Sequence, residues 1–216
     1  MTIKSKSRVK HQGEVFTSER EVSAMLDLVR HETERIESRF LEPACGDGNF
    51  LAPILENKIN IVTKRYKKSQ LEYERNIVTA VGSIYGVEYL EDNVEDCRKR
   101  LYEIFFKNYD LLFGKKVKKQ ICNSIKYIIQ RNIIWGDALT LTTPNKINQP
   151  IVFSEWSRPF NDSRVKRHDY YFHELTPNEK RDLFSKGVIS DEGKEGFIPE
   201  PVKSYPLIHI TKIGEI

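Results

Sequence analysis

The sequence has no run of about 18 apolar residues, the length that a membrane-spanning helix needs. The amino terminus also lacks an apolar segment after its first lysines, so nothing in it predicts secretion. We therefore expect a soluble protein of the cytoplasm without a membrane partner. The 216 residues are 39% hydrophobic, which is enough for a substantial core.

Cysteine is scarce, and its placement excludes two more classes of protein. Cys45, Cys97 and Cys122 are odd in number and far apart, so they predict neither a disulfide framework nor a zinc cluster with paired ligands. His168 and His173 have no third ligand nearby, and we interpret them as surface or packing residues. The sequence therefore predicts reduced thiols and no metal site.

An excess of positive charge is confined to the amino terminus. The formal net charge is +4, and the basic residues of segment 1–12 have no acidic neighbour: Lys4, Lys6, Arg8 and Lys10. We expect this leader to be a flexible tail, with contact to phosphate as the alternative. A second basic run, residues 64–68, is predicted to be an exposed turn. Charge alone therefore says little about nucleic acid.

Strand and helix patterns alternate along most of the chain. Capping patterns and apolar stripes predict helices at 18–38, from 50 onward, and at 69–81, 92–105 and 116–130, with strands at 39–42, 83–89, 132–135 and 150–153. This alternation predicts an α/β fold with a doubly wound parallel sheet that stops after the fourth strand. We expect the domain to span 13–157, followed by a short irregular extension at 158–216 for docking or DNA contact.

A loop with two glycines follows the first strand and organises the rest of the pattern. Gly46 and Gly48 leave the backbone open to a ligand, and Asn49 is predicted to cap the next helix. Ligands of doubly wound sheets bind beyond the carboxyl ends of the strands. Polar residues are expected at that edge after the other three strands: Glu88, Asp137 and Ser154.

This set of residues suits a ligand that carries a nucleoside. A carboxylate at Glu88 can accept from two ribose hydroxyls, and Asp137 can accept from the amino group of adenine. Both a dinucleotide and S-adenosylmethionine meet this description. A nicotinamide cofactor fits less well, because the loop lacks a third glycine and Glu88 lies farther along than the usual acid.

Four segments resemble, in order, the cofactor-binding motifs of amino-group DNA methyltransferases from restriction-modification systems: residues 13–17, 41–51, 85–88 and 135–139. The resemblance implies a class I methyltransferase fold, which is Rossmann-like, and S-adenosylmethionine as cofactor. It places Phe16 and Thr17 at the methionine end, Glu42, Ala44, Gly46 and Gly48 in the loop beneath it, Glu88 at the ribose and Asp137 at the adenine.

The catalytic motif of that family is not matched. The family has Asn, Asp or Ser before Pro-Pro and an aromatic residue, whereas this chain has Ser154, Glu155, Trp156 and Ser157. Ser154 can stand in for the polar position, and Trp156 or Phe160 can stack on a flipped base. We expect an adenine-type DNA methyltransferase, or its cofactor-binding subunit with a partner chain that supplies catalysis and target recognition. The alternative is an inactive module that binds cofactor or DNA and regulates or scaffolds a restriction system.

Overall fold

The computed structural model describes residues 19–145, 147–175, 188–189, 195–196 and 199–215. The basic leader, which ends at residue 12, lies outside the described residues, as do Phe16 and Thr17. Within the described part, no helix has both the length and the hydropathy that crossing a bilayer requires.

A parallel sheet of three strands forms the centre of the fold. The strands are β1 (Phe40–Glu42), β2 (Ile84–Glu88) and β3 (Ile133–Trp135), in that spatial order. Glu42 pairs with Gly86, and Glu88 pairs with Trp135. Every residue of β2 is buried, as its apolar composition predicts for the middle strand of a covered sheet. The expected α/β class and the first three strands are therefore confirmed.

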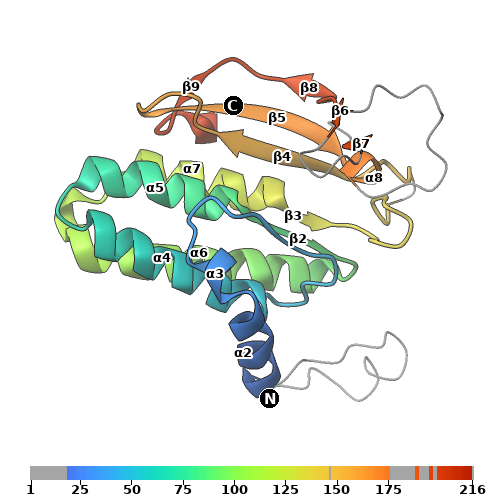
Figure 1. Cartoon of the computed structure of the whole chain (residues 1–216), viewed down its shortest axis with the longest axis horizontal. Coiled ribbons are helices and arrows are strands. Elements are labelled where there is room, and N and C mark those ends of the chain that lie inside the picture. Colours follow the sequence, from blue (N-terminus) through green and yellow to red (C-terminus); the bar gives the residue numbers. More distant parts are fainter. Residues whose placement is uncertain (1–18, 146, 176–187, 190–194, 197–198, 216) are drawn as a thin grey trace.

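Four long helices cover both faces of this sheet. They are α4 (Leu51–Tyr66), α5 (Gln70–Gly82), α6 (Glu91–Phe113) and α7 (Lys119–Asn132). Figure 1 shows α4 and α6 on one side of the sheet and α5 and α7 on the other. All four extend beyond the strands and pack on one another, with fully buried residues such as Ile54, Ile77, Phe105 and Ile125 between them.

The cap predicted at the start of α5 is confirmed, whereas the cap predicted at the start of α4 is wrong. The Ser69 side chain accepts from the Glu72 backbone N–H at 3.4 Å, so the predicted capping pattern opens α5. The predicted cap at Asn49 is wrong: α4 starts after Phe50, and the Asn49 Oδ1 atom instead accepts from Arg100 of α6 at 2.8 Å. Tertiary contact with α6 therefore takes the side chain away from the local cap.

The helix predicted over 18–38 is shorter and divided. It consists of α2 (Glu19–Leu28) and α3 (Arg30–Thr33). After α3, the backbone carbonyls of Arg35, Ile36 and Ser38 all accept from the buried ammonium group of Lys58 on α4, at 2.6 to 3.0 Å. A helix would use these carbonyls internally, so Lys58 favours an open chain here.

The segment expected to be the fourth parallel strand belongs to a second sheet. β4 (Val152–Ser157) pairs antiparallel with β5 (Arg164–Tyr171), and β5 also pairs with β8 (Lys203–Ser204) and β9 (Ile208–His209). The expected four-stranded doubly wound sheet is thus wrong at its last strand. Within the described part of 158–216, β5, β8 and β9 form a paired sheet, so the expected irregular extension is wrong there, and a boundary at 157 would divide the β4–β5 hairpin.

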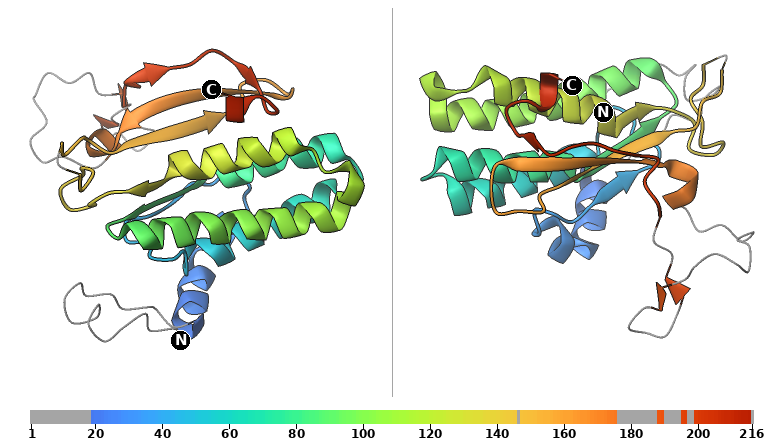
Figure 2. Two further views of the ribbon diagram at one scale, coloured as in Figure 1. Left: turned by 180° about the vertical axis from the view of Figure 1, so that it is seen from behind. Right: turned by 90° about the horizontal axis from the view of Figure 1, so that it is seen from above.

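Helices α5 and α7 lie between the two sheets and contact both, as Figure 2 shows from two further directions. Beyond the ends of these helices the sheets meet directly, where the Tyr85 and Phe153 rings lie 5.5 Å apart. The described remainder consists of α8 (Phe172–Leu175), the pair β6 (Val188–Ile189) and β7 (Glu195–Gly196), and the turns Gly114–Lys116 and Ile213–Glu215.

Candidate functional site

The glycine loop joins the end of β1 to α4 through two glycines that both have positive φ. Gly46 has φ +53° and Gly48 has φ +88°, in the region that favours residues without a side chain. A Cβ atom on Gly48 would lie 3.0 Å from the Cys97 Sγ atom, whereas one on Gly46 would meet nothing within 4 Å. The space beside Gly46 is therefore open.

The Glu88 carboxylate lies against this loop. Its Oε2 atom accepts from the Gly46 backbone N–H at 2.9 Å, and its Oε1 atom accepts from the Leu90 N–H at 2.9 Å. Glu88 is only 9% exposed. Each carboxylate oxygen has two acceptor positions, so these two bonds leave capacity for a further donor on each oxygen. Two of the four predicted segments are thus in direct contact.

Asp137 lies at the same edge of the sheet, just beyond β3. The Gly136 N–H donates to the Glu88 carbonyl at 3.0 Å, which ties the end of β3 to the end of β2. The Asp137 Oδ1 atom accepts from the N–H groups of Leu139 and Thr140, at 2.8 and 3.4 Å. Asp137 therefore shapes the loop that follows β3 and is half-buried at the strand end.

Glu42 and Ala44 complete the loop side of this edge. The Ala44 N–H donates to the Glu42 Oε1 atom at 3.3 Å, and burial raises the pKa of the Glu42 carboxyl. Below the loop, the hydrogen-bonded thiol of Cys97 and burial together raise the pKa of Cys45. The Cys45 and Cys97 thiols are both buried and free, and they pack beneath the loop. The raised pKa keeps Cys45 in its neutral thiol form.

One exposed ring at this edge has no counterpart in the sequence-based site. Tyr89 follows Glu88 directly and is 58% exposed, while its carbonyl accepts from the Trp135 indole N–H at 2.9 Å. In the sequence, an aromatic residue directly after the acid at the end of a predicted strand is the signal that would have identified it. Its ring offers a flat apolar surface beside Glu88.

The two candidate catalytic residues lie elsewhere, inside the antiparallel sheet. Ser154 is 0% exposed; its hydroxyl donates to the Asp169 Oδ1 atom at 2.7 Å and accepts from the Arg167 Nε atom at 3.1 Å. Trp156 is buried, and its indole N–H donates to the Asn132 Oδ1 atom at 3.1 Å. The structure brings neither side chain to the loop at Gly46.

Ser154 belongs to a buried ion-pair network that the sequence pattern did not indicate. Arg167 and Asp169 are both nearly fully buried on β5 and pair at 2.7 Å. Burial would raise the pKa of Asp169, but hydrogen bonds from Arg167, Ser154 and Tyr205 outweigh it and lower the pKa. The Arg167 guanidinium also donates to the Tyr127 hydroxyl at 2.8 Å, which joins the sheet to α7.

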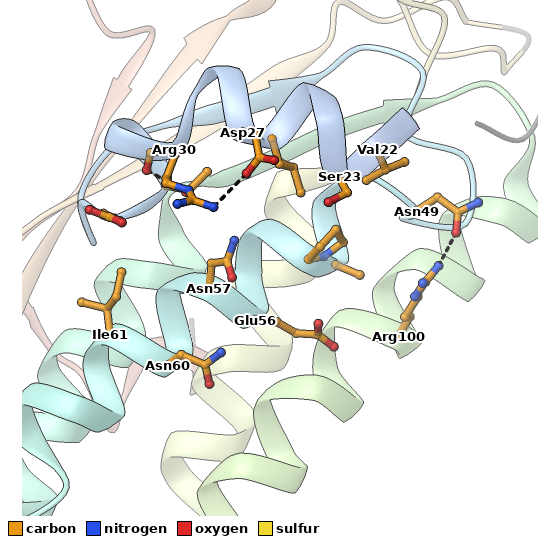
Figure 3. A pocket seen from close by; sticks show the side chains of 15 residues that line it. Val22, Ser23, Asp27, Arg30, Asn49, Glu56, Asn57, Asn60, Ile61 and Arg100 are labelled. Carbon is orange, nitrogen blue, oxygen red and sulfur yellow. Dashed lines mark hydrogen bonds and ion pairs between the residues drawn. The ribbon is translucent and has the colours of Figure 1, made fainter. Parts of the chain in front are cut away.

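A separate hollow of about 650 Å³ lies between α2, α3 and α4 (Figure 3). Asp27 and Arg30 pair at 3.0 Å on its α2–α3 wall, and Asn49 and Arg100 form its opposite end. The hollow reaches the glycine loop through Asn49 but is not lined by Gly46, Glu88 or Asp137. We place the candidate site where polar groups meet at the strand ends, because volume alone does not define chemistry.

The described residues contain no group of three or more His, Cys, Asp and Glu side chains that could hold a metal ion. Comparison of the chain with protein-family models, curated proteins and solved structures finds no match.

Proposed function

We propose that this chain binds S-adenosylmethionine at the carboxyl ends of β1, β2 and β3, as the cofactor-binding subunit of an adenine-type DNA methyltransferase from a restriction-modification system. The observation that carries the proposal is the contact between Glu88 and the backbone of Gly46 at 2.9 Å. It joins an acid that suits a ribose to a loop that leaves room for a ligand.

The residues at this edge fit the cofactor. Glu88 has acceptor positions for the two ribose hydroxyls, and the open space at Gly46 leaves room for the ligand. Asp137 would accept from the adenine amino group, and Tyr89 would contact the flat face of the base. When bound, the sulfonium group of the cofactor supplies the methyl group that is transferred.

The positions of Ser154 and Trp156 favour a subunit over a complete enzyme. Both side chains are buried and hydrogen-bonded in the second sheet, so neither is available to hold a target amino group. Methyl transfer depends on close positioning of donor and acceptor. We infer that a partner chain supplies the catalytic motif and the recognition of the DNA sequence.

The same burial also supports a second candidate: a methyltransferase-like module without catalysis that binds cofactor or DNA and regulates or scaffolds a restriction system. The two functions differ in one measurable respect. Methyl transfer to DNA is measured with labelled cofactor, with and without the protein encoded by the neighbouring gene. Transfer only in the presence of that protein supports the subunit. Cofactor binding without transfer in either case supports the inactive module.

Calorimetry with S-adenosylmethionine tests directly whether the chain binds this cofactor. We expect saturable binding of one molecule per chain, and a weaker response to a nicotinamide dinucleotide. Failure to bind S-adenosylmethionine, with the protein folded by circular dichroism, would overturn the cofactor-binding subunit and would leave only an inactive module that binds DNA.

A further inference from the structure

A second polar hollow, of about 410 Å³, lies at the opposite end of the parallel sheet. Its walls come from the end of α4, one side of α5 and the end of β4, and include Arg39, Arg65, Tyr66, Asn76, Ser157 and Arg158. Ser83, just before β2, also lines it, whereas Glu88 ends that strand. The hollow is therefore separate from the proposed cofactor site.

Arg158 is the central cation of this hollow. It follows β4, is half-buried, and its guanidinium donates to the Asn76 Oδ1 atom at 3.4 Å. No carboxylate within the described residues lies at ion-pair distance from it. A partly buried guanidinium without a counter-ion is costly, and burial together with nearby Arg75 lowers the pKa of Arg158, with Glu72 acting in the opposite sense.

Arg65 provides a second positive charge from another element. It lies in the last turn of α4 and is exposed, and it too forms no ion pair within the part of the chain that the structure describes. The other charged residues that line the hollow are already paired: Arg39 with Glu155, and Glu37 with Arg35 at 3.6 Å. Two guanidinium groups without carboxylate partners thus line one polar hollow.

We propose that this hollow binds a phosphate group, carried either by a nucleic acid strand or by a free nucleotide. Guanidinium groups bind phosphate oxygens through paired N–H donors, and Asn76 and Ser157 add neutral polar groups in the same wall. The exposed cations Lys64, Lys67 and Lys68 extend the positive charge past the hollow. That extension matches the repeated phosphates of a nucleic acid better than a single small anion.

Fluorescence anisotropy with labelled DNA oligonucleotides of increasing length, duplex and single-stranded, tests the site. The wild-type chain is compared with Arg158→Gln, Arg65→Gln and the matched control Lys99→Gln, which removes one exposed charge on α6 outside the hollow. Each is titrated between about 50 and 200 mM salt, with ATP and inorganic phosphate as competitors. Circular dichroism confirms that each variant is folded.

We expect each hollow variant to weaken binding at least fivefold and to reduce the salt-dependence slope by about one, while the control changes binding by less than twofold. Affinity that rises with oligonucleotide length assigns the phosphate to a nucleic acid. Competition by ATP that Arg158→Gln abolishes, without length dependence, assigns it to a nucleotide. Equal binding by wild type and both hollow variants would overturn the site, as would an equal loss in Lys99→Gln. Cofactor binding at Glu88 is measured separately and does not depend on either result.

Discussion

The Gly46 backbone N–H donates to the Glu88 carboxylate at 2.9 Å across 42 residues of sequence. This bond places the loop after β1 and the acid that ends β2 at one point. The glycine loop and the acid are separate signals in the sequence, so their contact in the structure is independent support for a shared ligand site.

The two loop glycines should respond differently to substitution. Gly48→Ala forces a side chain into φ +88° and against Cys97, and we expect a loss of order 1–3 kcal/mol in the free energy of unfolding. Gly46→Asn should leave stability nearly unchanged, because Asn tolerates φ near +53° and the space is open. It should still weaken S-adenosylmethionine binding by filling that space. Denaturant unfolding and calorimetry separate the two effects, and equal effects of both variants would contradict this account.

Glu88→Gln should weaken S-adenosylmethionine binding by roughly tenfold to a hundredfold, because hydrogen bonds to a charged group contribute about 1.5–3 kcal/mol. The amide nitrogen also cannot accept from the Gly46 or Leu90 N–H, so the loop loses one bond. Calorimetry measures the affinity, and unfolding measures the loop contribution. Glu91→Gln, an exposed acid three residues along, is the matched control. Unchanged affinity in Glu88→Gln would remove Glu88 from the site.

Lys58 should give the stability of the protein an alkaline pH dependence. Burial lowers the pKa of Lys58 from 10.5 to about 8, so between these values the unfolded chain holds a proton that the folded chain has released. The free energy of unfolding of the wild type should therefore rise relative to Lys58→Met as the pH increases from 8 to 10.5. Urea unfolding at several pH values measures the difference. A flat difference across this window would contradict the lowered pKa.

The buried pair on β5 should be far more costly to break than to remove. Arg167→Met alone leaves Asp169 charged and buried, and we expect a loss of about 3–5 kcal/mol in the free energy of unfolding. Arg167→Met with Asp169→Leu should lose less than the sum of the two single variants. Since the pKa of Asp169 is lowered, its contribution to stability should be lost only as the pH falls below the ordinary value of 3.8. Urea unfolding measures all of these quantities, and Arg164→Met, at an exposed pair with Asp162, should change stability little.

Ser154→Ala should affect stability and leave methyl transfer intact. The variant removes a donor to the buried Asp169, and we expect a loss of about 1–3 kcal/mol in the free energy of unfolding. Methyl transfer, assayed with the neighbouring gene product at a temperature where the variant is folded, should equal that of the wild type. Loss of transfer without loss of stability would instead assign Ser154 a catalytic role.

Residues whose signal is local were predicted correctly. Ser69 caps α5 through Glu72, and the continuous apolar run of β2 is buried throughout. The turn at Gly46 and Gly48 also follows from the sequence, since a Gly-x-Gly after a strand predicts positive φ. The helix predicted over 92–105 instead continues to Phe113. Tyr109 and Phe113 extend its apolar stripe and pack on Tyr73 of α5.

The second sheet was not predictable from hydropathy, because its inward positions on β5 include Arg167 and Asp169. These charges can be buried because they pair with each other, because Arg131 lies 3.6 Å from the Asp169 carboxylate, and because Ser154, Tyr127 and Tyr205 supply further hydrogen bonds. A fourth parallel strand would have placed Ser154 at the carboxyl edge of the first sheet. Because β4 pairs with β5 instead, Ser154 and Trp156 both lie in the second sheet.

The sequence by itself determined the α/β class, the three parallel strands and the glycine loop, because period, capping and backbone freedom act within a few residues. Only the tertiary structure decided that Glu88 contacts Gly46, that Lys58 holds the chain after α3, and that β4 leaves the parallel sheet. Those outcomes depend on partners tens of residues away, whose charges and hydrogen bonds must be satisfied together once water is excluded.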